Sequence, residues 1–310
     1  RMTFGQVVIG PAGSGKSTYC NGMQQFLTAM GRKCVIVNLD PANHQLPYEA
    51  AVDIREVFRL EKVMEEHELG PNGGIMHCME SLEKNLDWLR ETLSAHKDSY
   101  ILFDCPGQLE LYTHHQSMSA VVAALEKWHY RLAAVHLVDS YYCTDPASYI
   151  SALMLSLSTM LRIGLPHVNI FSKIDLLKNY DGKLAFQIDF YTDVMQLDYL
   201  LPHLDSHPFT SRFKALNRKL CETVEDYQLV VFQTLNIEDK ESMFNVLKVI
   251  DKSIGYVANP DELTARVALF AAADPNLERY RHVDVQEKYV EVETPLGILT
   301  EDDLNLDNWA

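Results

Sequence analysis

A chain of 310 residues with 47% hydrophobic content can bury a full core, as one large domain or as one domain with an appendage. Its formal net charge of -16 argues against a general nucleic-acid binder, because neutralising phosphates requires clustered lysine and arginine. No apolar run approaches the roughly 18 residues of a membrane span, so we expect a soluble, cytoplasmic protein that contacts neither membrane nor nucleic acid directly.

Strand-like runs alternate with helix-length segments, which is typical of an α/β fold with a mostly parallel sheet and helices on both faces. The predicted strands are 6–10, 34–40, 100–104, 132–139, 167–172 and 229–235. The predicted helices are 16–30, 53–69, 75–96, 116–129, 146–163 and 240–257, with a mainly helical insertion at about 176–228. We therefore predict one domain over residues 3–258.

The segment 259–310 is predicted to be a C-terminal extension that is acidic and partly disordered. From Asp284 onward, eight Asp or Glu residues stand against the single Lys288, a net charge of -7. Such a charge run is typical of a solvated tail or of one that binds a partner.

The first strand ends in "GPAGSGKST", which matches the phosphate-loop pattern GxxxxGK[ST] between a strand and a helix. Its glycines leave backbone N–H groups free to surround phosphate oxygens at the positive end of the following helix. We expect Lys16 to reach the terminal phosphates and the Ser17 hydroxyl to bind magnesium. The alternative is a glycine turn that only caps the helix.

The second predicted strand ends at Asp40, in "NLDPANH". No Ser or Thr lies between Asn38 and Ser81, so this stretch offers no threonine for the metal ion. The Asp40 carboxylate is a candidate for ordering magnesium-bound water or the attacking water. The alternative is an aspartate that caps a turn before Pro41.

Five residues of turn chemistry, Gly70-Pro71-Asn72-Gly73-Gly74, separate two predicted helices. Gly70 and Pro71 are expected to form a tight turn, and the following glycines to let the chain leave it. Asn72 would then stand at the tip of a rigid loop, as an amide donor for a terminal phosphate where no arginine is available. The alternative is an asparagine in a left-handed turn.

The third predicted strand, in "YILFDCPGQ", ends at Asp104. An acidic residue at this place, together with a phosphate loop, predicts a second metal-positioning group. Gly107 and Gln108 follow where a backbone amide can meet a terminal phosphate. Taken alone, Asp104 could equally cap the next turn, but the pair of motifs favours a site for a magnesium nucleoside triphosphate.

The base is predicted from Ser172-Lys173-Ile174-Asp175, a variant of the Asn-Lys-x-Asp guanine reader. Asp175 would accept hydrogen bonds from guanine N1–H and the 2-amino group, which adenine lacks, and Lys173 would lie along the base. Hydrogen bonds to a charged group contribute roughly 1.5 to 3 kcal/mol each, so guanine should be preferred by roughly 10² to 10⁴.

The motifs "GPAGSGKSTYC", "NLDPA", "VDIRE", "LGPNGG", "LFDCPGQLELYTH", "HLVDS" and "SKIDLL" occur in the order and spacing of the GPN-loop GTPases. The chain resembles that family over roughly residues 4–258. The stretches "LPYEAAVD", "DSYYCTDPASYIS" and "LNIEDKES" are most similar to its type-two eukaryotic branch.

The resemblance implies hydrolysis of GTP to GDP with Mg²⁺ by a homodimer, or by a heterodimer with a paralogue, in which each loop faces the partner's nucleotide. It implies that Gln108 and Glu110 are candidates for organising water or the loop, and that 234–236 is the fifth guanine motif. The other implied site residues are the phosphate-binding Gly13, Ser14, Gly15, Lys16, Ser17 and Thr18, the loop residues Gly70, Pro71 and Asn72, and the base-binding Ser172, Lys173 and Asp175.

The resemblance also implies a role in assembly and nuclear import of RNA polymerases alongside chaperone machinery, with shuttling to the nucleus. One alternative is an assembly scaffold that nucleotide stabilises and that turns over negligibly. Another is the related arsenite-pump and tail-anchored-protein ATPases, which share "DPA". Those ATPases carry a lysine where this phosphate loop has Ala12.

Overall fold

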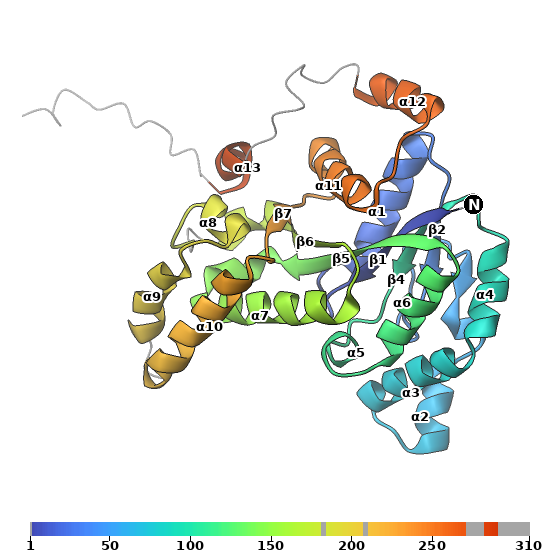
Figure 1. The fold of residues 1–310 in the computed structure, drawn as a ribbon, viewed down its shortest axis with the longest axis horizontal. Coiled ribbons are helices and arrows are strands. Elements are labelled where there is room, and N and C mark those ends of the chain that lie inside the picture. Colours follow the sequence, from blue (N-terminus) through green and yellow to red (C-terminus); the bar gives the residue numbers. More distant parts are fainter. Residues whose placement is uncertain (1, 181–183, 207–209, 271–281, 291–310) are drawn as a thin grey trace, which may run out of the picture.

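One parallel sheet organises the protein, and its central strand is the first in the chain. The computed structural model describes residues 2–180, 184–206, 210–270 and 282–290. Strand order is β3-β2-β4-β1-β5-β6-β7, with every neighbouring pair parallel (Figure 1). The strands are β1 (Thr3–Ile9), β2 (Cys34–Asn38), β3 (Val52–Asp53), β4 (Tyr100–Asp104), β5 (Tyr130–Asp139), β6 (His167–Ser172) and β7 (Phe232–Thr234). The predicted α/β class is confirmed.

Helices cover both faces of the sheet (Figure 1). Helices α1 (Lys16–Ala29) and α11 (Lys240–Ile254) pack on one face. The opposite face is covered by α3 (Pro71–Lys84), α4 (Leu86–Ser94), α5 (Glu110–Thr113) and α6 (Ser117–Lys127). All five residues of β4 are buried, as expected for a strand enclosed between two helical layers.

Every secondary-structure element described between β6 and β7 is a helix or a helical turn. After a 3-10 turn, η3 (Ile174–Tyr180), come α8 (Ile188–Asp193), the short turn η4 (Leu197–Leu200), α9 (Leu201–Ser206), the short turn η5 (Thr210–Phe213) and α10 (Lys214–Tyr227). Together with α7 (Pro146–Ile163), these helices enclose a third apolar cluster at the β6–β7 end of the sheet. Among the described residues, no helix is both long and apolar enough to cross a bilayer.

Two helices follow the predicted domain end near residue 258. They are α12 (Pro260–Phe270) and α13 (His282–Tyr289), and both contact the core. The remainder of the extension, residues 271–281 and 291–310, lies outside the described residues, and with it most of the segment for which disorder is predicted.

Two helix predictions differ from the structure. The segment 53–69 begins as the edge strand β3 and a 3-10 turn, and only Leu60–His67 forms a helix, α2. A strand of two residues shows no alternation of apolar and polar positions, so its pattern cannot be recognised. The segment 75–96 divides at Asn85, whose side-chain amide donates to the Ser81 carbonyl oxygen at 2.7 Å and competes with the helical backbone.

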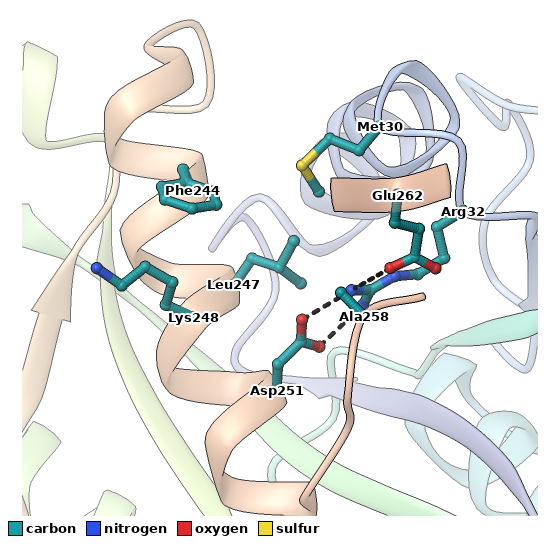
Figure 2. A pocket seen from close by; sticks show the side chains of 8 residues that line it. All are labelled: Met30, Arg32, Phe244, Leu247, Lys248, Asp251, Ala258 and Glu262. Carbon is teal, nitrogen blue, oxygen red and sulfur yellow. Dashed lines mark hydrogen bonds and ion pairs between the residues drawn. The ribbon is translucent and has the colours of Figure 1, made fainter. Parts of the chain in front are cut away.

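A buried arginine, Arg32, ties the C-terminal extension to the side of the sheet where the amino ends of the strands lie. Arg32 makes two hydrogen bonds to Asp251, at 2.9 and 2.8 Å, and one of 3.3 Å to Glu262 of α12 (Figure 2). Its guanidinium carbon lies 3.8 Å from the centre of the Tyr256 ring. Arg32 and Glu262 are each only 4–5% exposed, so α12 is held by charges that water screens little.

Candidate functional site

The parallel strands bring the predicted site residues to one edge of the sheet. In register, Val8 of β1 lies beside Asp104 of β4, and Asp139 of β5 lies beside Ser172 of β6. Each pair stands at or next to the carboxyl end of its strand. Residues far apart in sequence therefore meet around the loop that follows β1, at the edge where open α/β sheets bind ligands.

The phosphate loop has backbone conformations that require glycine. Gly10, Gly13 and Gly15 have φ angles of 143°, 79° and 92°, which L-residues with a side chain rarely adopt. Gly15 directly precedes α1, so the free N–H groups of the first turn are directed into the loop.

Lys16 spans the phosphate loop and is only 7% exposed. Its ammonium group donates to the carbonyl oxygens of Gly10 and Pro11, each at 3.1 Å. Burial lowers the pKa of Lys16, and the nearby charges of Asp104 and Asp40 oppose that shift. The lysine charge is thus preorganised beside two carboxylates.

The chain after β4 lies directly against the phosphate loop. A Cβ atom on Gly107 would lie 2.9 Å from Ala12 Cα and 3.1 Å from Lys16 Nζ, so only glycine fits there. The next residue, Gln108, has a buried side-chain oxygen without a hydrogen-bond partner among the described residues. Glu110 is exposed at the first position of α5.

Asp104 is fully buried at the end of β4. Its Oδ2 accepts a hydrogen bond of 2.6 Å from the Tyr48 hydroxyl, whereas Oδ1 has no partner within the described part of the chain. Burial raises the pKa of Asp104, while the Tyr48 hydrogen bond, the neighbouring Ser17 hydroxyl and the Lys16 charge lower it. A buried carboxylate oxygen without a donor is a fitting ligand for a hard cation.

Asp40 caps a turn and also lies near Lys16. Its Oδ1 accepts from the Ala42 N–H at 2.9 Å, as the turn-capping alternative predicts. Burial raises the pKa of Asp40, and the Ala42 hydrogen bond and the Lys16 charge lower it. The carboxylate is therefore both a turn cap and a neighbour of the phosphate loop.

Three residues that sequence reasoning missed hold this region together. Asn43 Nδ2 donates to Ser17 Oγ at 2.9 Å, and Arg55 donates to the Asn43 carbonyl oxygen at 2.7 Å. Arg55 is in turn fixed by Asp53, with a closest contact of 2.6 Å. Tyr48 is the third, through its bond to Asp104. Of these contacts, only the one between Asp53 and Arg55 has a signal in the sequence. The two opposite charges stand two residues apart in "VDIRE", a spacing that suggests a turn.

The Ser172–Asp175 stretch lines a cavity of ≈ 150 Å³ beside the phosphate loop. Ser172 Oγ donates to the Ser14 carbonyl oxygen at 2.8 Å, which joins the two motifs. Lys173 has a φ angle of 58° and its ammonium contacts Asp139 Oδ2 at 2.6 Å. The other lining residues are Ser14, Gly15, Thr18, Tyr19, Leu137, Asp175, Leu235, Asn236, Ile237 and Glu238. Two of the three residues suggested as the fifth guanine motif, 235 and 236, therefore lie here.

The expected rigid loop at 70–74 is instead the start of a helix. Gly70 is extended and precedes α3, Pro71 is its first residue, and Asn72 lies in the first turn. Proline suits this position because the first helical N–H needs no partner. Asn72 is exposed and its side chain makes no hydrogen bond within the described residues, so this chain's own phosphate loop does not receive it.

Gly73 and Gly74 were predicted to give a loop its backbone freedom, but in the structure they are helical residues. A Cβ atom on Gly74 would lie 2.8 Å from Leu60 Cδ1 and from Met64 Cγ, both in α2. Gly74 therefore permits close packing of α2 on α3. At Gly73 the nearest atom would be 3.4 Å away, an ordinary contact.

Comparison with known proteins gives one family over most of the chain. Residues 8–256 match the family described as "Conserved hypothetical ATP binding protein". GPN-loop GTPase 2 of Danio rerio is 56% identical over 291 residues, covering 94% of this chain and 93% of the relative. GPN-loop GTPase QQT1 of Arabidopsis thaliana is 55% identical over 295 residues, covering 94% and 99%.

A solved structure supports the same assignment of the fold. A GTPase from Pyrococcus abyssi in its apo form superposes with a TM-score of 0.66 at 26% identity, and the match covers 81% of this chain and 97% of that one.

Replacement of the two helical glycines tests the corrected reading of residues 70–74. Gly73→Ala should raise the free energy of unfolding by up to about 1 kcal/mol, because alanine favours the helix. Gly74→Ala should lower it by about 1 to 3 kcal/mol, because the new methyl group overpacks against α2. Urea denaturation of the two variants provides the measurement. Equal losses at both positions would instead support a loop that needs glycine for its backbone.

Proposed function

The chain belongs to the type 2 GPN-loop GTPases and hydrolyses GTP, and on that premise we propose that it does so with Mg²⁺, as one half of a dimer. The observation that carries the proposal is the meeting of the phosphate loop, buried Asp104 and the Ser172–Asp175 cavity at one sheet edge. Phosphates, cation and base thus have adjoining places on one protomer.

The residues present fit a magnesium ion. Asp104 Oδ1 is a buried oxygen without a donor, and Ser17 Oγ, which accepts from Asn43, keeps a lone pair available. Ser17 and Asp104 would hold the ion, and Asp40 would order water beside it. Bound Mg²⁺ neutralises charge on the phosphate oxygens.

This chain's own groups bind and orient the phosphates. The first-turn N–H groups of α1 and the Lys16 ammonium offer donors to phosphate oxygens. The burial of Lys16 strengthens its attraction to the anion, because water screens it little. Gln108, whose buried side-chain oxygen lacks a partner, is positioned next to Gly107 to orient water.

Guanine selectivity is proposed to depend on Asp175. The match to a family described as ATP-binding leaves the base open, whereas the relatives named above are GTPases. Asp175 lies exposed at the rim of the base cavity, where a carboxylate accepts from guanine N1–H and the 2-amino group. Adenine presents an unprotonated N1 and no amino group there.

Substitution of Asp175 tests base selectivity. Calorimetric titration should show that the unaltered protein prefers GTP to ATP by roughly 10² to 10⁴, and that Asp175→Ala loses most of this preference. Asp226→Ala, a change to an exposed aspartate of α10, is the control and should leave the preference intact. ATP binding within tenfold of GTP by the unaltered protein would exclude guanine reading.

Dimerisation is supported by the position of Asn72. An exposed amide at the first turn of a helix, with no hydrogen bond inside the described residues, is available to a neighbouring molecule. We propose that it approaches the terminal phosphate bound by a second protomer and stabilises charge there, since no arginine among the described residues forms a hydrogen bond with the phosphate loop.

A mixing experiment tests action in trans. Asn72→Ala should lower single-turnover GTP hydrolysis by roughly 10² to 10³, the usual effect of losing one such donor. Lys16→Ala, which retains Asn72, should not bind nucleotide. Mixed dimers of the two variants should recover hydrolysis at the intact nucleotide site. If the mixed dimers do not recover hydrolysis, with subunit exchange verified by labelled protomers, Asn72 acts within its own chain.

We further propose a cellular role in assembly and nuclear import of RNA polymerases, with polymerase subunits and chaperone machinery as partners, in the cytoplasm and shuttling to the nucleus. The net charge of -16 favours protein partners over direct contact with nucleic acid. Depletion of the protein should leave polymerase subunits in the cytoplasm, as imaging of a tagged subunit would reveal. Unchanged nuclear signal, with depletion verified, would contradict this role.

A further inference from the structure

The C-terminal helix α13 packs on the loop that carries the base reader. Val285 is fully buried and Tyr289 is 6% exposed, in an apolar cluster with Ile174, Leu177 and Ile188. Two of those partners, Ile174 and Leu177, belong to η3, the turn that contains Asp175. This helix lies outside the residues that match the family, which end at 256.

Tyr289 also contacts the second loop of the base cavity. Its hydroxyl accepts from Asn236 Nδ2 at 3.0 Å and donates to Asp239 Oδ2 at 3.1 Å. Asn236 lines the cavity together with Asp175. The other end of the Asn236 amide, Oδ1, accepts from the Glu238 N–H at 3.0 Å, so both ends of this side chain are held.

Asp239 anchors this arrangement to the core. It caps α11 by accepting from the Glu241 N–H at 3.0 Å, and it accepts from Lys288 of α13 at 2.5 Å. Although burial acts to raise it, the hydrogen bond and charge of Lys288 hold the pKa of Asp239 below its ordinary value. The ionised carboxylate thus joins α13 to both the β7–α11 loop and α11.

We propose that Tyr289 is a positioning residue for the base cavity, and that α13, by holding two of the loops that line it, slows the release of guanine nucleotide. The inference rests on the proposed function, in which Asp175 binds the base. Hydrogen bonding at Asn236 fixes one wall, and apolar packing under Ile174 fixes the other. Opening the cavity requires α13 to lose contacts that lie outside the cavity itself.

Release of a fluorescent GDP analogue, chased with unlabelled GDP, tests the proposal on the full chain. Tyr289→Phe keeps the ring in its apolar cluster and removes the hydroxyl. It should speed release roughly five-fold, the effect expected from losing the hydrogen bond to Asn236, which is the one of its two hydrogen bonds that reaches the cavity. The single-turnover rate at saturating GTP should not change, because the phosphate loop is untouched. Lys288→Ala, a change at a 54% exposed side chain that removes the ion pair with Asp239, should also speed release.

Tyr256→Phe is the matched control. It removes a hydroxyl that donates to Glu262, also in the C-terminal part of the chain. This contact lies at the amino ends of the strands, away from the base cavity, so release should be unchanged. Unchanged release in both Tyr289→Phe and Lys288→Ala would overturn the proposal. So would a lower melting temperature of the nucleotide-free Tyr289→Phe protein with no change in release, which would make α13 a purely structural element.

Asp175→Ala separates this inference from the proposed function. If Asp175→Ala speeds release of GDP and Tyr289→Phe does not, the base site stands and the role of α13 fails. If Asp175→Ala leaves both release and base preference unchanged, the cavity is not the base site. In that case the proposed function fails, and the role of α13 with it.

Discussion

Parallel pairing of β1 between β4 and β5 is the constraint on which the rest of the molecule depends. It directs every strand end to one edge, and there it sets Lys16 beside the carboxylates of Asp104 and Asp40. The lysine opposes the effect of burial on both acids, and they oppose its effect on the lysine. Burial of any one of these charges alone would cost free energy, and their mutual attraction retains the cluster at the proposed phosphate site.

The region between β2 and β3 holds residues next to this cluster in place through hydrogen bonds. Asp53 holds Arg55, Arg55 holds the backbone at Asn43, and Asn43 contacts the Ser17 hydroxyl. Tyr48, from the same stretch, occupies one oxygen of Asp104 and leaves the other without a donor. This stretch has no threonine. It offers instead the Asn43 amide beside Ser17 and the Tyr48 phenol beside Asp104. The two residues proposed to hold the cation, Ser17 and Asp104, are therefore ordered by neutral side chains.

The sequence predicted those parts of the fold and site whose signals are local. The phosphate loop, the strand ending at Asp104 and the Ser172–Asp175 stretch each combine a buried strand with polar residues at its end, and the sheet is built from those strands. Tyr48 and Asn43 were not predicted, because their contacts arise only when distant segments fold together. Gly74 was misread because a glycine close to a proline in the sequence looks the same whether it serves a turn or the close approach of two helices.

The close packing of α2 on α3 has a mechanical consequence. Because a glycine lets α2 lie against the first turn of α3, the two helices form one closely packed hairpin, and α3 also packs on the sheet (Figure 1). Asn72 stands in the first turn of α3, so its position depends on the packing that Gly74 permits between the two helices. The exposed charges of α2, Lys62 and Glu66, belong to the same packed pair of helices as Asn72.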